Sequence, residues 1–566
     1  MKFQLNSQDV RFGFGVSSNA VVKFPGLGIP TAPVGAAAVG DYSDTTLGNV
    51  GTPGDFGYDS PAVSRWDVIP MQEVVEYPYI GLVAFHVNNI DKVEFSLNGG
   101  TWTEVTEMKE NPSSGVYEYC VKVDTTSLNA DDEIELRAKI TPLTAGQVYG
   151  IDPITVKYNY SSELIGWVSP SGSDSTGDAT EGNPCRTPLK ALNVLLAGSV
   201  YTDPEFSEKV TIYCTAGEHV IADNSYGYNP AMSDGWVTIQ SAPGVAASSV
   251  IFRDTIDSGT ITGRGWRVRN TRLKGVTFEG QIYPRTPVGE SVPNVWIDGV
   301  TYSRTEAVDD VWLQASWTDR YATSCAFENL NDGPKFCTVL RNSTLNNYTE
   351  DAVGYSRLVA NCVVTQNTFS LASAHPDFLH VQDCDEHSIF YNVVGLDING
   401  QGIYSGSETD FAENMAFVNC LAVLESGAAV TSAPASQIRN TDVTTMAIRN
   451  VIIDSCTILN GQSFILDEGA SPTGPSRDVV LRNSIIYGPS SNLGAGVLTE
   501  SNNWYIDTDG NFTCVGGTFS TTTATYSSVA DLVPTEAGIV GQAVRPDIKT
   551  DARGILRTTN NIGALG

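Results

Sequence analysis

A short motif recurs along the chain from residue 163 onward: a few apolar or β-branched residues, then Asn or Asp, then more apolar residues. Its polar residues are Asn270, Asp298, Asn342, Asn361, Asn392, Asn419, Asn450 and Asn483. Successive members are 28, 44, 19, 31, 27, 31 and 33 residues apart. A repeat of this length predicts a solenoid in which each repeat forms one coil and contacts only its neighbours.

The strand pattern favours a parallel β-helix among solenoids. Strands of neighbouring coils pair through the backbone, and an Asn side chain at a recurring corner can bond to the Asn of the next coil. A β-propeller is the alternative, although its blades usually run about 40 to 50 residues. No long βαβ periodicity is present, which disfavours a TIM barrel or a Rossmann fold. We therefore predict an all-β chain.

The start of the repeat region predicts a cap. Thr187 can N-cap a helix and Pro188 suits its first position. Its leucines would cover the open end of the solenoid, namely Leu189, Leu192, Leu195 and Leu196. Residues 166–192 resemble the opening of right-handed parallel β-helix proteins of the pectate-lyase-like superfamily, and residues 551–564 resemble their closing turn. The resemblance implies a right-handed parallel β-helix over 161–566, in a fold that hosts lyases, hydrolases, epimerases and binding spikes.

Two further regions precede the solenoid. Over residues 61–160, short alternating strands and turn signals such as Asn98-Gly99-Gly100 predict an immunoglobulin-like β-sandwich. No Cys…Trp…Cys pattern supports an antibody-type domain. Residues 1–60 are rich in Gly, Pro, Ala and Ser, which predicts an extended N-terminal arm that serves as an attachment segment.

The charge balance narrows the partners. With 64 acidic and 33 basic side chains the formal charge is −31, so nucleic acid is not an expected partner. No apolar stretch is long enough for membrane insertion, and no apolar region follows Lys2, so we expect no signal peptide. The ten cysteines include no C-x-x-C pair and are expected to be buried free thiols.

The best catalytic candidates are Asp351 and Asp377, which are 26 residues apart, about one coil. In register, their backbones would lie about 4.8 Å apart. Their carboxyl groups would then fall in the range of roughly 5 to 9.5 Å typical of glycosidases, with one protonated and one ionised. Glu350 is a further candidate. His375 should share a side of its strand with Asp377 and orient substrate, whereas His380 should point to the other side.

Other side chains around these positions predict a sugar-binding groove. The candidate substrate-binding residues are His380, Tyr355, Arg357, Gln401, Tyr404 and Trp312. A lyase is the alternative, with a base drawn from Lys335, Arg357, Tyr355 and His375. No cofactor is required, although Asp383, Asp385 and Glu386 offer oxygen ligands for Ca²⁺.

The arm, the absence of a signal and the long solenoid together resemble a bacteriophage tailspike or virion fibre. That resemblance implies a homotrimer that binds a host surface polysaccharide, depolymerises it by glycosidic hydrolysis, and contacts other virion proteins through its N-terminal region. The implied location is the virion or the extracellular space. A bacterial polysaccharide lyase and a non-enzymatic virion or adhesin protein are the alternatives.

Overall fold

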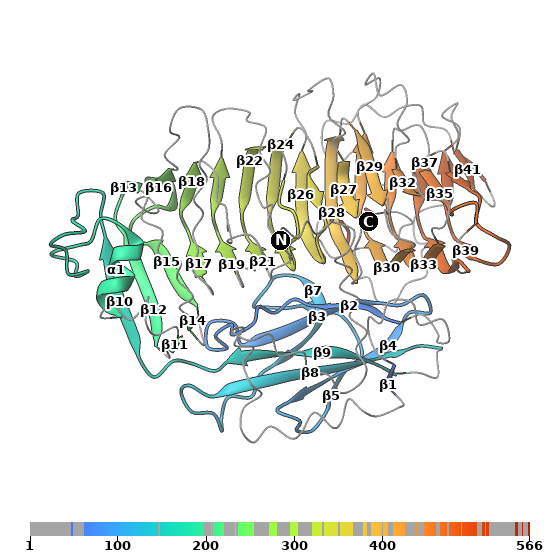
Figure 1. The fold of residues 1–566 in the computed structure, drawn as a ribbon. Coiled ribbons are helices and arrows are strands. Elements are labelled where there is room, and N and C mark those ends of the chain that lie inside the picture. The colour runs from blue at the N-terminus through green and yellow to red at the C-terminus, as the bar shows by residue number, and fades with distance from the viewer. Residues whose placement is uncertain are drawn as a thin grey trace, which may run out of the picture.

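The structure is a computed structural model, and the part of the chain it describes is almost entirely β (Figure 1). The described residues are 47–48, 61–144, 148–196, 205–206, 208–219, 232–233, 236–253, 271–279, 295–303, 320–330, 333–348, 351–365, 377–381, 387–398, 400–405, 411–424, 436–439, 447–459, 464–471, 475–487, 489–506, 512–514, 517–519, 550–552, 557 and 564–565. Most of the predicted N-terminal arm and Asn270 lie outside them. Among these residues, no helix combines the length and the apolar character needed to cross a bilayer.

The chain from β10 onward is a parallel β-helix, as predicted, with strands in three rows along its axis. The first row contains β10 (Glu163–Val168), β12 (Lys209–Cys214), β15 (Val237–Ser241), β17 (Thr271–Lys274), β19 (Val295–Asp298), β21 (Arg320–Thr323), β23 (Val339–Arg341), β26 (Leu358–Thr365), β28 (Ser388–Ile398), β30 (Phe411–Val418), β33 (Ala447–Asp454), β36 (Arg477–Arg482) and β39 (Leu498–Ser501). Each strand pairs in parallel with the strand one coil later, and this regular pairing fixes the pitch of the coils.

The second and third rows complete each coil. The second contains β13 (Gly217–His219), β16 (Val250–Arg253), β18 (Thr277–Glu279), β20 (Thr301–Ser303), β22 (Ala326–Leu330), β24 (Thr344–Tyr348), the ends of β26 and β28, β31 (Leu421–Leu424), β34 (Thr457–Leu459), β37 (Ile485–Tyr487) and β40 (Trp504–Ile506). The third contains β25 (Val353–Gly354), β27 (Asp377–Val381), β29 (Gln401–Ser405), β32 (Ser436–Arg439), β35 (Phe464–Asp467) and β38 (Pro489–Ser491).

Inside the coils, apolar side chains stack from one turn to the next. Phe252 lies 5.5 Å from Phe278, centroid to centroid, and Phe390 lies 5.2 Å from Phe417. Burying these rings along one axis supplies a continuous apolar core. The eight cysteines whose side chains the structure describes are buried and free, in agreement with the expectation for them.

The predicted ladder of asparagines forms at the bend between the first and second rows. Asn361 donates to Asn342, Asn392 to Asn361, and Asn419 to Asn392, with N···O distances of 3.3, 2.9 and 2.6 Å. The backbone is left-handed there, with φ between 52° and 58° at these four residues, a conformation that Asn tolerates better than most residues. The ladder therefore satisfies buried amides and turns the chain at the same point in each coil.

Two members of the sequence motif lie elsewhere. Asn450 bonds to Asn414 at a different corner, and Ser455 has the left-handed backbone at the main bend of that coil. Asp298 stands one residue before the bend, where Gly299 has φ 62°. Several small or polar residues can adopt this conformation, so the polar residue of the motif is not always the corner residue.

The first end of the solenoid is capped as predicted. Helix α1 (Pro188–Leu195) begins after Thr187, whose side chain accepts from the Lys190 backbone N–H at 3.2 Å. Leu192 and Leu196 are buried against the first coils. At the other end the expectation differs from the structure. The described C-terminal residues lie against the middle coils, where Arg557 donates to Asn419 at 2.7 Å. Among the described residues, the last parallel strand is followed by a hairpin of β41 (Phe512–Cys514) and β42 (Gly517–Phe519).

A β-sandwich precedes the solenoid in the chain. One sheet has the order β2 (Val63–Trp66), β3 (Tyr79–Phe85), β7 (Tyr117–Lys122) and β6 (Lys109–Glu110), and the other has β1 (Leu47–Gly48), β9 (Val148–Lys157), β8 (Glu133–Pro142), β4 (Ile90–Leu97) and β5 (Thr103–Val105). The predicted turn at Asn98 joins β4 to β5. Its likeness to an immunoglobulin domain stays a prediction.

The sandwich packs on the outer face of the first row (Figure 1). Outward-facing aromatic rings of the solenoid, such as Trp296 and Tyr391, share one apolar cluster with the sandwich. Buried polar contacts fix the docking. Arg341 donates to the Asp67 carboxylate at 2.7 Å, and His387 accepts from the Ser64 backbone N–H at 3.1 Å. The sandwich therefore covers the first row, and no described residue of the third row belongs to the apolar cluster that it forms there.

Candidate functional site

Asp351 and Asp377 lie on consecutive coils at the third row. Asp377 is the first residue of β27, and Asp351 stands two residues before β25. Val353 pairs with Leu379, which sets the two aspartates opposite each other, and the Ala352 backbone N–H donates to the Asp377 carbonyl at 2.8 Å. The parallel pairing of coils thus brings together two carboxylates that are 26 residues apart in sequence.

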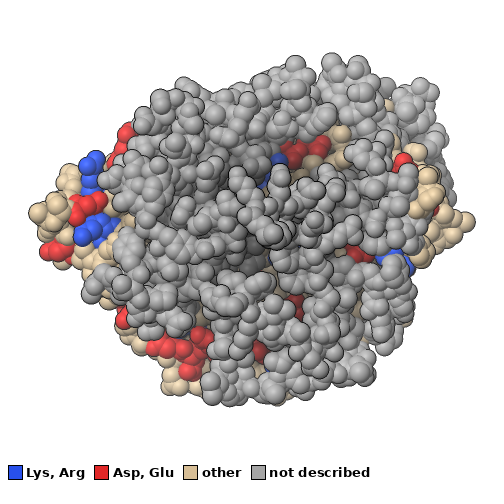
Figure 2. All heavy atoms as spheres, viewed as in Figure 1, with Lys and Arg blue, Asp and Glu red and all other residues tan. Residues whose placement is uncertain are grey.

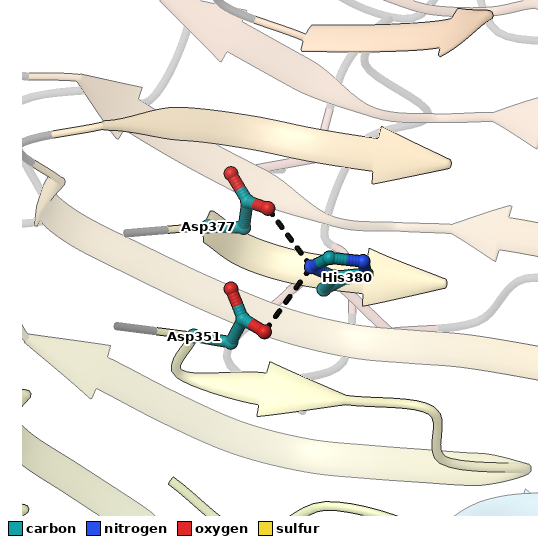
Figure 3. Close-up of side chains that lie close together, drawn as sticks. All are labelled: Asp351, Asp377 and His380. Atoms are coloured by element: carbon teal, nitrogen blue, oxygen red, sulfur yellow. Dashed lines mark ion pairs between the residues drawn. The ribbon is translucent and has the colours of Figure 1, made fainter. Parts of the chain in front are cut away.

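Both carboxylates point toward one histidine ring (Figure 3). His380 Nδ1 lies 2.9 Å from Asp377 Oδ2 and 3.1 Å from Asp351 Oδ2. All three side chains are nearly buried, with exposed fractions of 10% for Asp351, 5% for Asp377 and 12% for His380. This arrangement places the imidazole between two negative charges, within ion-pair distance of both acids.

Lys335, one coil earlier, completes the group. Its Nζ lies 3.0 Å from Asp351 Oδ2, and the residue pairs with Gly354 through a parallel bridge. We call Asp351, Asp377, His380 and Lys335 the charged cluster. Two anionic and two cationic side chains balance within it when all four are ionised.

Burial and ion pairing shift the pKa values of Asp351 and His380 in opposite directions. Burial disfavours the imidazolium, yet the hydrogen bonds and charges of Asp351 and Asp377 raise the pKa of His380 to about 10. Burial by itself would raise the pKa of Asp351, but His380 and Lys335 together hold it below its usual value. At neutral pH the cluster therefore contains an imidazolium and an ionised Asp351.

A row of aromatic rings runs along the axis beside the charged cluster. Phe336 stacks on Tyr355 at 4.7 Å between centroids, Tyr355 stacks on His380 at 5.1 Å, and Tyr404 meets His380 edge-on at 4.8 Å. All four rings are half-buried. These rings adjoin the charged cluster, and aromatic side chains beside polar groups are typical of surfaces that contact sugars.

The other predicted site residues have different outcomes. Gln401 pairs with Asp377 one coil later, while Arg357 lies in the turn between β25 and β26, where its carbonyl accepts from Ile389. Six predicted residues lie outside the described part of the chain, namely Glu350, His375, Trp312, Asp383, Asp385 and Glu386.

The expected direction of the His380 side chain is wrong. Alternation along a strand predicts that His380 points away from Asp377, but the two side chains meet. Phe378 and Leu379 are both in the core, so regular alternation begins only after the first residues of β27. Asp377 therefore belongs to the bend that leads into the strand.

Sequence reasoning did not place Lys335 beside Asp351 and missed Phe336 altogether. A usable signal is present in the corner residues, because Asn342 and Asn361 are 19 residues apart and Lys335 pairs with Gly354, also 19 residues on. The spacing of corners thus gives the length of one coil and the partner of Lys335.

Two carboxylates and an imidazole are also side chains that can bind a metal ion. One oxygen of each aspartate and a ring nitrogen of His380 all lie within 4.8 Å of one another. A cation bound there would have to displace the proton of His380 and compete with the ammonium group of Lys335 at 3.0 Å. These residues fit a charge-balanced ion-pair cluster better than a metal site, and no step below uses a metal.

Figure 2 relates this region to the molecular surface. Acidic side chains beside basic ones reach the surface on the face drawn there, over the part of the solenoid that carries β27 and β29.

Comparisons with known proteins complete the description. No protein-family model matches the sequence, and no curated protein matches it. Among solved structures, the family 28 exopolygalacturonase of Yersinia enterocolitica matches with a TM-score of 0.30 and 11% sequence identity. The match covers 79% of this chain and 99% of that chain. The TM-score and the sequence identity are both too low for residues or activity to be transferred from that enzyme.

Proposed function

We propose that this chain is a polysaccharide-binding β-helix protein that hydrolyses glycosidic bonds at the charged cluster. The observation that supports it is the convergence of two buried carboxylates from consecutive coils, 2.9 and 3.1 Å from one imidazole. Paired carboxyl groups are the working parts of most glycosidases. The adjoining rings of Tyr355 and Tyr404 give a surface for contact with sugars.

The spacing of the carboxylates favours a double displacement. An oxygen of Asp351 lies within 4.8 Å of an oxygen of Asp377, nearer to the roughly 5 to 5.5 Å of retaining glycosidases than to the roughly 6.5 to 9.5 Å of inverting ones. In the first step one carboxylate attacks the anomeric carbon, and the leaving oxygen takes a proton from the other carboxyl group. In the second step that group removes a proton from water, whose oxygen replaces the enzyme carboxylate at the anomeric carbon.

The Lys335 contact argues against a lyase that uses this residue as its base. A lyase needs a neutral base at the working pH, whereas Lys335 forms an ion pair with Asp351 at 3.0 Å. Removing its proton would break that pair. Of the other candidate bases, His375 lies outside the described residues, and Arg357 and Tyr355 stay candidates. Hydrolysis uses the two carboxyl groups directly and needs no neutral Lys335.

The resemblance to a bacteriophage tailspike also suggests where the protein acts. We infer a homotrimeric virion surface protein that attaches through its N-terminal region to other virion proteins. The docking of the β-sandwich through buried pairs such as Arg341 with Asp67 supports a rigid connection between attachment and binding parts. Light scattering on the full chain tests the trimer, since a monomer mass would contradict it.

An activity screen tests the chemistry. Purified protein is incubated with bacterial surface and marine polysaccharides, and both new reducing ends and the absorbance of unsaturated uronates are measured. We expect reducing ends without unsaturated products, and a fall of about 100-fold or more in Asp377→Asn. Asp467→Asn, on the third-row strand β35, is the matched control and should keep its activity.

The other outcomes identify the alternatives. Unsaturated products would indicate a lyase and a basic catalyst. Binding of a polysaccharide without any product would indicate an adhesin or a structural spike, and would remove the catalytic role from both aspartates.

A further inference from the structure

We propose that Lys335 is a positioning residue that divides the roles of the two aspartates, keeping Asp351 as the ionised carboxylate and leaving Asp377 as the proton donor. The inference rests on the proposed hydrolysis at the charged cluster. It is carried by geometry, because the two aspartates are nearly equivalent in register and burial but Lys335 stands on the Asp351 side of the pair.

The two carboxylates face different sets of donors. Asp351 Oδ2 lies 3.0 Å from Lys335 Nζ and 3.1 Å from His380 Nδ1, so one oxygen faces an ammonium and an imidazolium. Asp377 Oδ2 lies 2.9 Å from the same His380 Nδ1. His380 bridges the aspartates almost symmetrically and cannot by itself decide which of them carries a proton.

Lys335 is held in a fixed position by its backbone and its neighbours. The residue is half-buried, and the parallel bridge to Gly354 ties its backbone to the next coil. Its Nζ lies 5.8 Å from the centroid of the Tyr355 ring, which forms one wall beside the ammonium group. A cation held this way lowers the free energy of an adjacent carboxylate at low cost in side-chain freedom.

Two other titratable groups, Tyr348 and His380, face the pair. Tyr348 of β24 is buried, and its pKa is raised by burial and by the charges of Asp377 and Asp351, so it stays neutral. His380 is shared between both acids. Lys335 is then the feature that breaks the symmetry, and when the pair takes up one proton, that proton goes to Asp377.

This assignment gives a balanced reaction. Asp351 forms the bond to the anomeric carbon as the bond from that carbon to the leaving oxygen breaks. The electron pair stays on that oxygen, which takes the proton of Asp377. Water then gives a proton back to Asp377, and its oxygen displaces Asp351, so one water is consumed for each bond cleaved.

The test follows the protonation of both aspartates by carbon-13 NMR. The protein is labelled at the aspartate carboxyl carbon, and the Asp351 and Asp377 signals are assigned with single Asn variants. In the wild type, Asp377 should protonate at higher pH than Asp351. In Lys335→Met the titration midpoint of Asp351 should rise by about 1 to 3 pH units, so that the difference between the two midpoints shrinks or changes sign. Lys335→Arg should keep the wild-type order of the midpoints.

Kinetics give the second readout. The acid limb of the pH profile of kcat/KM should move to higher pH in Lys335→Met, and more than the basic limb. A merely structural role would lower kcat/KM at every pH without moving the limbs. Lys209→Met removes an ion pair with Glu73 at the sandwich and should leave the profile unchanged.

The results separate this inference from the proposed function. Equal NMR midpoints in wild type, or midpoints that Lys335→Met leaves in place, would overturn the inference even if hydrolysis is found. A protein without hydrolytic activity would overturn the proposed function, and the NMR order would still decide whether Lys335 sets the protonation of the pair.

Discussion

The charged cluster predicts that stability falls as pH rises from neutral to alkaline. His380 has its pKa raised from 6.5 to about 10 in the folded protein by Asp351 and Asp377 against the opposing effect of burial. A raised pKa means that the folded state holds the proton more tightly than the unfolded state. The stabilisation is therefore complete below pH 6.5 and is lost as pH rises toward 10.

The size of the effect follows from the same values. A difference between 6.5 and about 10, at about 1.4 kcal/mol per pH unit, corresponds to about 5 kcal/mol in the free energy of unfolding. The ring is 12% exposed, so solvent screens the interaction only weakly. Between pH 7 and 10 the predicted loss is about 4 kcal/mol.

The assay is urea unfolding, followed by tryptophan fluorescence, of wild type and His380→Asn at several pH values. The stability difference between them should shrink by about 4 kcal/mol from pH 7 to pH 10. His219→Asn is the control, because His219 is buried against Phe252 with a lowered pKa and stays neutral over this range. A wild-type advantage over His380→Asn that is the same at pH 7 and pH 10 would refute the reasoning.

Two further predictions concern packing. Arg341→Met should cost about 3 to 5 kcal/mol, because it leaves Asp67 buried without its cation, and adding Asp67→Asn should recover most of that loss. Thermal unfolding of the single and double variants checks this, and a double variant as unstable as the single would contradict it. Gly333→Ala should cost about 1 to 3 kcal/mol and lower activity, since its Cβ would lie 1.7 Å from the Ala352 carbonyl oxygen beside the charged cluster. Gly182→Ala, with no atom within 4 Å, is the control for both measurements.

The repeat of apolar residues and asparagines was sufficient to predict the β-helix. Each Asn of the motif that the structure describes has a left-handed backbone, so the pattern reports on local conformation directly. Asn450 shows the limit of that pattern, because an Asn at a second corner of the coil has the same local sequence as one at the first. The reversal of the C-terminal segment onto Asn419 depends on contacts between distant residues and has no local signal.

The candidate site was predictable only in part. The spacing of Asp351 and Asp377 matches one coil, which is a property of the sequence. The contact between His380 and Asp377 could not be predicted from the sequence, because the alternation of side chains fails at the start of β27. Lys335 was considered only as a lyase base, because its pairing with Asp351 requires the length of the preceding coil.

The asparagine ladder also bears on how such a chain can change over evolution. Asn361 and Asn392 are 31 residues apart whereas Asn342 and Asn361 are 19 apart, and yet their side chains stay in hydrogen-bonding contact. The corner bonds therefore keep their register while the number of residues per coil changes. A coil can gain or lose residues between its corners without displacing the strands of the next coil.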